Sequence, residues 1–110
     1  MATDSIPAIL LALRDAVNAG DTDAFLAFFP STGSVEDWGR RFSGHPAIRG
    51  WSDKELIGAQ GTMTFGPVIE RSPERISLQV DWISTFFTGP GIFTFVLADG
   101  KIAEMKISGA

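Results

Sequence analysis

The sequence predicts an α+β domain in which three N-terminal helices pack on an antiparallel sheet. Apolar residues in the first half recur at helical spacing, as in the stripe from Ile6 to Val17. The second half instead alternates apolar and polar residues, most clearly over residues 76–83, and contains glycine-rich turns. Helices followed by a run of strands are typical of the α+β class.

Capping and breaking residues bound the predicted helices. Asp4 or Ser5 can cap the first helix, because either side chain can accept from free backbone N–H groups one turn along. Gly20 can take the left-handed conformation that ends this helix. Asp21 is expected to cap a second, short helix that Pro30 stops. The third helix is expected from His45-Pro46 to about Ile57.

The predicted strands include one early hairpin and a later run. They are expected at Ser34–Trp38, with Arg41–Gly44 as its hairpin partner, and at Thr62–Glu70, Ile76–Ile83, Ile92–Leu97 and Ile102–Ile107. Gly66-Pro67 predicts a kink or bulge, and Gly89-Pro90-Gly91 predicts a turn. Asp99-Gly100 is typical of a type I′ hairpin, which needs positive φ at both central residues.

Composition narrows the class of function. The 110 residues suit a single domain, and a net charge of −4 argues against a nucleic-acid partner, which needs a basic face. The absence of cysteine excludes disulfides and thiolate metal sites, and a single histidine argues against a zinc or iron site; no cofactor is implied. The N-terminus does not read as a signal peptide, and no apolar stretch approaches the roughly 18–20 residues of a membrane helix. The cytoplasm is therefore the expected location.

The last strands are apolar on both sides. Phe93, Phe95 and Leu97 alternate with Ile92 and Val96, so neither face of this part of the sheet is strongly polar. A sheet with two apolar faces needs two covers, and the helices supply only one. We therefore expect a homodimer that covers the outer face.

Several motifs resemble the SnoaL-like (nuclear transport factor 2-like) superfamily, which includes ketosteroid isomerases, polyketide cyclases and limonene epoxide hydrolases. The similar positions, clearest over residues 5–58, are Asn18-Ala19-Gly20-Asp21, Phe25, Phe28-Phe29, Val35-Glu36-Asp37, Phe42, Gly44, Ala47-Ile48 and Trp51. The run Asp37-Trp38-Gly39-Arg40 is most similar to an uncharacterised bacterial branch. The resemblance implies a cone-shaped fold with a strongly curved sheet and an apolar pocket for a small molecule.

The resemblance also implies a catalytic base. In ketosteroid isomerases the acid of a Val-Glu-Asp run shuttles the proton, and Asp37 falls on that position. Because Val35 and Asp37 share one strand face, Asp37 is expected to face inward as an unpaired carboxylate. The alternative is a strand-end carboxylate paired with Arg40 or Arg41.

The sequence lacks other groups that ketosteroid isomerases and epoxide hydrolases use. Isomerases also use a tyrosine and a protonated aspartate, but the corresponding positions hold Leu13 and, approximately, Gly91. An epoxide-hydrolase reaction would need an acid–arginine–acid set. Asp81 and Glu104 are on strands, without an arginine that can be placed between them.

Five further residues are candidates for ligand binding. Trp38, Trp51 and Trp82 either line a pocket or simply fill the cone. Arg40 either holds an anion or pairs with local acids, and Glu55 lies at the pocket mouth or on a solvated helix face.

Three functions stay open. One is an isomerase-, cyclase- or hydrolase-type enzyme with Asp37 as base. The others are a non-catalytic module that binds a small apolar molecule and a dimerisation module. A cavity above roughly 300 Å³ with Asp37 at its wall would favour the first two.

Overall fold

The computed structural model describes residues 6–109, which form three helices and one six-stranded sheet. The helices are α1 (Ala8–Ala19), α2 (Thr22–Ala27) and α3 (His45–Glu55). The strands are β1 (Ser34–Asp37), β2 (Arg40–Ser43), β3 (Thr62–Arg71), β4 (Arg75–Ile83), β5 (Gly89–Ala98) and β6 (Lys101–Ser108). The predicted α+β class is confirmed, with the β1–β2 hairpin inserted between α2 and α3. No helix among the described residues is long and apolar enough to cross a membrane.

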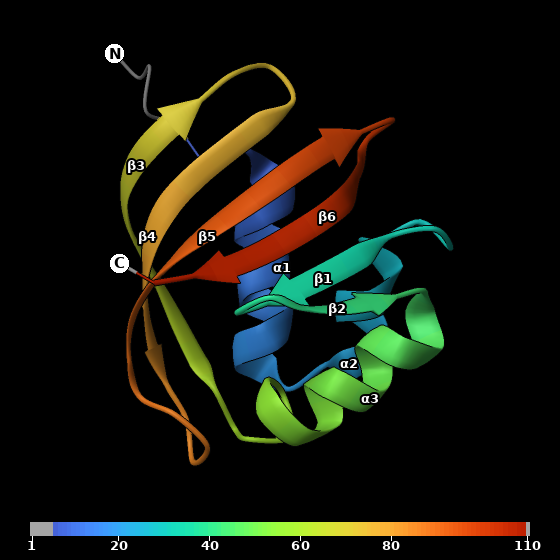
Figure 1. Ribbon diagram of the computed structural model, residues 1–110, viewed down its shortest axis with the longest axis vertical. Helices are drawn as coiled ribbons and strands as arrows, with labels where there is room; N and C mark the ends of the chain where they lie inside the picture. The colour runs from blue at the N-terminus through green and yellow to red at the C-terminus, as the bar shows by residue number, and fades with distance from the viewer. Residues whose placement is uncertain (1–5, 110) are drawn as a thin grey trace.

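The strands follow the order β2-β1-β6-β5-β4-β3 in a curved sheet that does not close (Figure 1). Most neighbouring strands are antiparallel, as expected, but β1 and β6 are parallel, with Val35 opposite Met105. The prediction of a purely antiparallel sheet is wrong at this pair. Antiparallel neighbours joined by short turns have their direction fixed by the turn, whereas more than sixty residues separate β1 from β6.

Local turn chemistry is mostly as predicted. Asp99 and Gly100 have φ values of 53° and 76°, and the ladder between β3 and β4 shifts register between Phe65 and Val68. The turn expected at Gly89-Pro90-Gly91 is wrong, because β5 already begins at Gly89 and the chain reverses over residues 84–88. Pro90 is tolerated because β6 pairs with β5 only from Ile92 onward, so β5 has one open edge there.

The helix boundaries agree with the predicted capping at α2. The Asp21 side chain accepts from the Ala24 N–H at 3.1 Å, and Gly20 has a φ of 74°. At α1 the N-cap is Pro7, without a side-chain hydrogen bond, and the predicted caps Asp4 and Ser5 lie outside the described residues. α3 ends at Glu55, slightly before the predicted Ile57.

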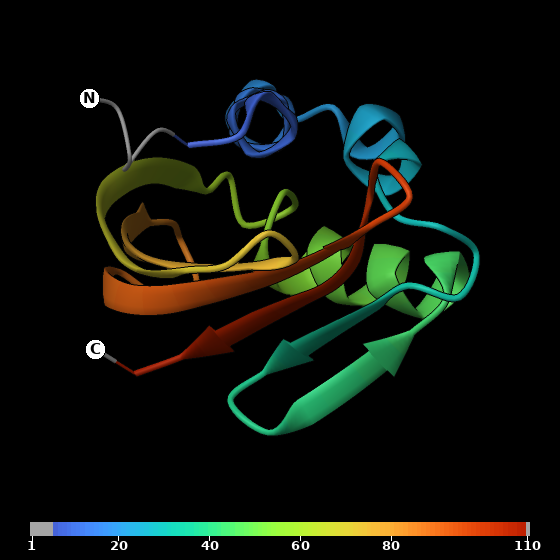
Figure 2. The same ribbon diagram turned by 90° about the horizontal axis from the view of Figure 1, so that it is seen from above.

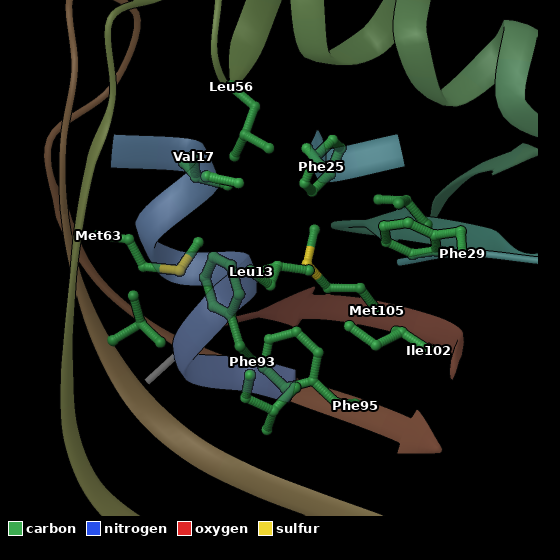
Figure 3. Packing of buried hydrophobic residues seen from close by; sticks show 14 of the residues in the cluster. Leu13, Val17, Phe25, Phe29, Leu56, Met63, Phe93, Phe95, Ile102 and Met105 are labelled. Carbon is green, nitrogen blue, oxygen red and sulfur yellow. The ribbon is translucent and has the colours of Figure 1, made fainter. Parts of the chain in front are cut away.

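The helices lie on one side of the sheet, where β3 curls toward α1 (Figure 2). Leu13 and Val17 of α1 belong to one buried cluster with Phe93, Phe95 and Met105 of the sheet (Figure 3). Burying these apolar side chains is the main stabilising contribution, at roughly 1.5–3 kcal/mol for each large one. Four members of this core, Trp51, Leu56, Trp82 and Phe93, also line the site described below.

Asn18 fixes how α1 meets the sheet. Its side chain donates to the Met63 carbonyl at 3.0 Å and accepts from the Met63 N–H at 2.7 Å. Two hydrogen bonds from one amide hold the end of α1 to the start of β3.

Candidate functional site

A cavity of about 220 Å³ opens between the β1–β2 hairpin, the end of α3 and the start of β5. All six residues selected from the sequence line it: Asp37, Trp38, Arg40, Trp51, Glu55 and Trp82. The other lining residues are Leu56, Phe86, Phe87, Gly89, Pro90, Gly91, Phe93 and Ile107. Asp37 is at the cavity wall, as expected, but the volume of about 220 Å³ does not reach the expected value of roughly 300 Å³, so the cavity suits a molecule smaller than a drug-sized ligand.

A two-residue turn positions the charged end of the cavity. Trp38 and Gly39 both have positive φ, 51° and 86°, and Asp37 is paired with Arg40 across the hairpin. Positive φ at both central residues is the type I′ geometry that matches the twist of paired strands. The turn therefore brings the Asp37 and Arg40 side chains together at the pocket wall.

Asp37 faces inward, as expected, and is only 8% exposed. It is not unpaired: Arg40 Nη2 lies 2.7 Å from Oδ2, and Trp51 Nε1 donates to the same oxygen at 3.0 Å. The prediction of an unpaired carboxylate is wrong, and the alternative pairing with Arg40 is correct. Arg41 instead lies 3.1 Å from Glu104 and 3.9 Å from Glu36, on the outer face of the sheet.

The second oxygen of Asp37 is available to a ligand. Both side-chain hydrogen bonds to Asp37 are accepted by Oδ2, and no described group donates to Oδ1. Within residues 6–109 no fully buried side-chain oxygen lacks a partner, so Oδ1 retains some accessible surface. Because Asp37 lines the cavity, this oxygen can accept a hydrogen bond from a molecule bound there.

Arg40 bridges two acids. Besides Asp37 it contacts Glu55, with Nη2 to Oε1 at 2.6 Å and Nη1 to Oε2 at 2.9 Å. This bidentate hydrogen bonding lowers the pKa of Glu55 and raises that of Arg40. An acid–arginine–acid set is thus present. It consists of Asp37, Arg40 and Glu55 rather than the strand acids Asp81 and Glu104 considered from the sequence.

Two tryptophans form the inner wall. Trp51 stacks on Phe42, with ring centroids 6.0 Å apart. Trp82 packs against the backbone of Gly61, where an added Cβ would lie 1.8 Å from its ring. Glycine at position 61 is therefore a requirement of this close approach.

Three other aromatic side chains surround the mouth. Trp38, Phe86 and Phe87 are 61%, 64% and 50% exposed, which is unusual for large apolar groups. Phe86 and Phe87 were not predicted from the sequence. Their signal was an adjacent aromatic pair in a segment that no predicted strand included.

Ser84 holds the loop that carries this aromatic pair. Its hydroxyl group accepts from the Phe86 and Phe87 N–H groups at 3.1 and 2.9 Å, and its O–H donates to the Phe87 carbonyl oxygen at 2.8 Å. Trp82 Nε1 also donates to it at 3.2 Å. One serine thus connects the inner wall of the cavity to its rim.

Solved structures of known proteins share this architecture. A candidate polyketide cyclase from Sinorhizobium meliloti is 25% identical, with a TM-score of 0.81 over 94% of this chain and 95% of its own. The Δ5-3-ketosteroid isomerase of a Mycobacterium species is 20% identical, with a TM-score of 0.82 over 98% of this chain and 95% of its own. A Mycobacterium tuberculosis protein in complex with estradiol-17β-hemisuccinate is 21% identical, with a TM-score of 0.80 over 91% of this chain and 89% of its own.

The chain has the SnoaL-like fold. The resemblance to the SnoaL-like (nuclear transport factor 2-like) superfamily seen in the sequence is thereby confirmed. No family model matches the sequence, and the comparison with curated proteins finds no match either.

Two positions separate this SnoaL-like domain from an isomerase site. Leu13 is fully buried in the core and has no hydroxyl group, and Gly91 lines the cavity without a carboxyl group. The tyrosine and protonated aspartate of an isomerase oxyanion hole thus have no counterpart at these positions. Loss of one oxyanion donor typically costs ~10²–10³ in rate.

His45 lies away from the cavity. Its Nε2 is 2.8 Å from the Phe29 carbonyl oxygen, to which it donates as the first residue of α3. This contact gives His45 a structural role, because it ties the start of α3 to the segment after α2.

Proposed function

We propose that this SnoaL-like domain binds a small, mainly apolar molecule in its cone, and that Asp37 Oδ1 is the polar group that recognises it. The observation that carries the proposal is the free Oδ1 at the wall of an aromatic cavity, beside an Oδ2 held by two donors. A fixed carboxylate with one open oxygen is pre-organised to accept a hydrogen bond, so little ordering cost falls on binding.

The tryptophans provide a direct test. The chain has three tryptophans and no tyrosine, and all three tryptophans line the cavity. Intrinsic fluorescence therefore reports on the site. Titration with single-ring alcohols and amines is expected to give a saturable change in emission. Absence of any saturable change, together with unchanged melting temperature, would contradict ligand binding in the cone.

Asp37→Asn tests the role of the carboxylate. The variant keeps the shape but loses the charge that Arg40 pairs with, so we expect the free energy of unfolding to fall by about 1–3 kcal/mol. Ligand affinity is expected to fall at least tenfold at a temperature where the variant is folded. Asp15→Asn, on the exposed side of α1, is the matched control and is expected to change neither quantity appreciably.

A second candidate function is water addition to a small epoxide. It is favoured by the Asp37–Arg40–Glu55 set, in which one guanidinium holds two carboxylates at the cavity. Asp37 Oδ1 would take a proton from water while the water oxygen bonds to an epoxide carbon and the C–O bond of the ring breaks. The same proton would then pass from the Asp37 carboxyl group to the ring-opened oxygen, which gives the diol and restores the carboxylate. Styrene oxide is small enough for a test by product analysis. Diol formation that Asp37→Asn abolishes would support this reaction, and no diol above the uncatalysed rate would exclude it for this substrate.

A further inference from the structure

The charges of the residues that line the cavity do not sum to zero. Asp37 and Glu55 contribute two carboxylates, and Arg40 contributes a single guanidinium that is shared between them. Among the described residues that line the cavity, these are the charged ones, so one negative charge is in excess. Both carboxylates are largely buried, with side chains 11% and 15% exposed, so water screens this excess only partly.

Nearby cations offset this excess only in part. Lys54, at the end of α3, attracts the Glu55 carboxylate and helps to lower its pKa, but Lys54 is exposed, so water screens this attraction. The cations of the adjacent sheet, Arg41 and Lys106, lie within 4 Å of acids on the outer face, at 3.1 Å from Glu104 and 3.9 Å from Glu36 respectively. The protein as a whole carries a net charge of −4, which adds to the attraction of cations.

The rest of the lining is aromatic. Six rings surround the same space: Trp38, Trp51, Trp82, Phe86, Phe87 and Phe93. The faces of aromatic rings attract cations, tryptophan most strongly, and the attraction grows when the cation is desolvated. Three of these side chains are at least half exposed at the mouth, where a bound molecule would cover them.

We propose that the ligand is a small organic ammonium ion with an apolar body. This inference rests on the proposed function and specifies its ligand class. An ammonium N–H would donate to Asp37 Oδ1, the excess negative charge would balance its charge, and the aromatic rings would contact its remaining surface. An anionic ligand would instead bring a second negative charge next to Asp37.

Volume limits the size of this cation. A cavity of about 150 Å³ can hold benzene. The cavity here, at about 220 Å³, has room for one ring and a short side chain. A fused four-ring molecule would require the aromatic loop at residues 84–88 to move outward.

Three probes of nearly equal size test the sign of the charge. Phenethylammonium, phenethyl alcohol and phenylacetate share one ring and one short chain but are cationic, neutral and anionic. Calorimetric titration at low ionic strength is expected to give the tightest binding for phenethylammonium, at least tenfold tighter than the alcohol, and the weakest for phenylacetate. Added salt is expected to reduce the preference.

The outcomes separate this inference from the proposed function. If the alcohol binds as tightly as the cation, the ammonium assignment is overturned while ligand binding stands. If none of the three binds, both are overturned. A preference for the cation that persists undiminished in Asp37→Asn would place the cation elsewhere and would also overturn the assignment, whereas Asp15→Asn is expected to keep the preference.

Phe86→Leu provides a second variant whose folding is not at risk, because this side chain is 64% exposed. Leucine keeps apolar volume but removes the aromatic face. We expect the affinity for phenethylammonium to fall severalfold and that for phenethyl alcohol to change much less. An equal loss for both probes would contradict the cation–aromatic part of the inference.

Discussion

At the scale of single residues, Arg40 organises the site, because one guanidinium contacts both acids of the cavity. Its side chain is 51% exposed, so water weakens these ion pairs relative to fully buried ones. The geometry is nevertheless bidentate toward Glu55, which adds directional preference to the attraction. Replacing Glu55 therefore tests how much the bridge contributes to folding.

The contribution of Glu55 is expected to depend on pH. Arg40 lowers the Glu55 pKa from its ordinary value of 4.5, so the stabilisation is fully present above that pH. It is lost as pH falls through the lowered folded-state pKa. We predict that Glu55→Gln lowers the free energy of unfolding by about 1 kcal/mol at neutral pH, after allowance for screening of the exposed Arg40.

Urea denaturation at several pH values checks this prediction. The difference between wild type and Glu55→Gln is expected to shrink as pH falls below 4.5. In the control, Asp15→Asn removes an exposed ion pair of 3.0 Å and is expected to cost close to nothing at any pH. A difference that is constant down to the acid transition would show that the carboxylate charge of Glu55 does not stabilise the fold.

At the scale of elements, the β1–β2 hairpin is notable for the residue at its turn. Trp38 adopts a φ of 51°, although a bulky side chain is unfavourable there and asparagine or glycine is usual in type I′ turns. The indole is 61% exposed, so it gains little from burial that would offset the unfavourable backbone. Because Trp38 lies at the cavity mouth, we propose that contact with a ligand, and not stability, is the reason for tryptophan here.

Trp38→Asn separates these two effects. Asparagine tolerates positive φ, so we predict that the melting temperature rises, with a gain of about 1 kcal/mol in the free energy of unfolding. Affinity for phenethylammonium is predicted to fall, because one aromatic face of the cavity is lost. Differential scanning calorimetry and calorimetric titration measure the two quantities.

The hairpin at Asp99-Gly100 is the matched control. Asp99 has a φ of 53° and lies away from the cavity, so Asp99→Asn is expected to alter stability only slightly and binding not at all. A Trp38→Asn variant that is less stable than wild type would mean that the indole packs favourably despite its exposure.

At the scale of the whole molecule, the outer face of the sheet suggests assembly. Ser77 and Thr94 face outward, share a hydrogen bond of 2.8 Å and are buried. Ile92 and Val96 flank them on the same face of β5 and are partly exposed. On the same outer face, ion pairs link Arg41 to Glu36 and Glu104, and Lys106 to Glu36.

We predict that two copies associate through this face. A stable interface usually buries about 1,200–2,000 Å² in total. Sedimentation at tens of micromolar should give twice the chain mass of 11.8 kDa. Val96→Lys should give the single-chain mass, because a charge would be buried at the interface, whereas Ile69→Lys on β3 should not. A wild-type monomer at these concentrations would rule out this assembly.

Much of the fold could be predicted because it depends on short-range chemistry. Asp21 caps α2, Asp99-Gly100 closes the last hairpin, and the alternation over 76–83 gives β4. The parallel pairing of β1 with β6 could not be predicted in this way. This pairing is a contact between residues that are far apart in the chain, and no local pattern specifies which strand lies next to β1.

The residues of the site also divide into those that the sequence could predict and those that it could not. Asp37, Trp38 and Arg40 were found because they share one hairpin and one motif. Phe86 and Phe87 were missed, because only the curvature of the sheet brings the loop after β4 to the mouth of the cone. The pairing of Asp37 also depended on distance, since its partner could equally have been Arg41 until the strand register was known.

The sequence by itself determined the α+β class, the capped helices, the hairpin turns and the SnoaL-like resemblance, because each depends on residue type and local spacing. Only the tertiary structure decided that Arg40 bridges Asp37 to Glu55, which lies in α3, and that the cavity holds about 220 Å³. The physical reason is that ion pairs and cavities are set by positions in space of residues from different elements. A pattern along the chain constrains each element separately, and the charge and size of the pocket arise only when the elements pack together.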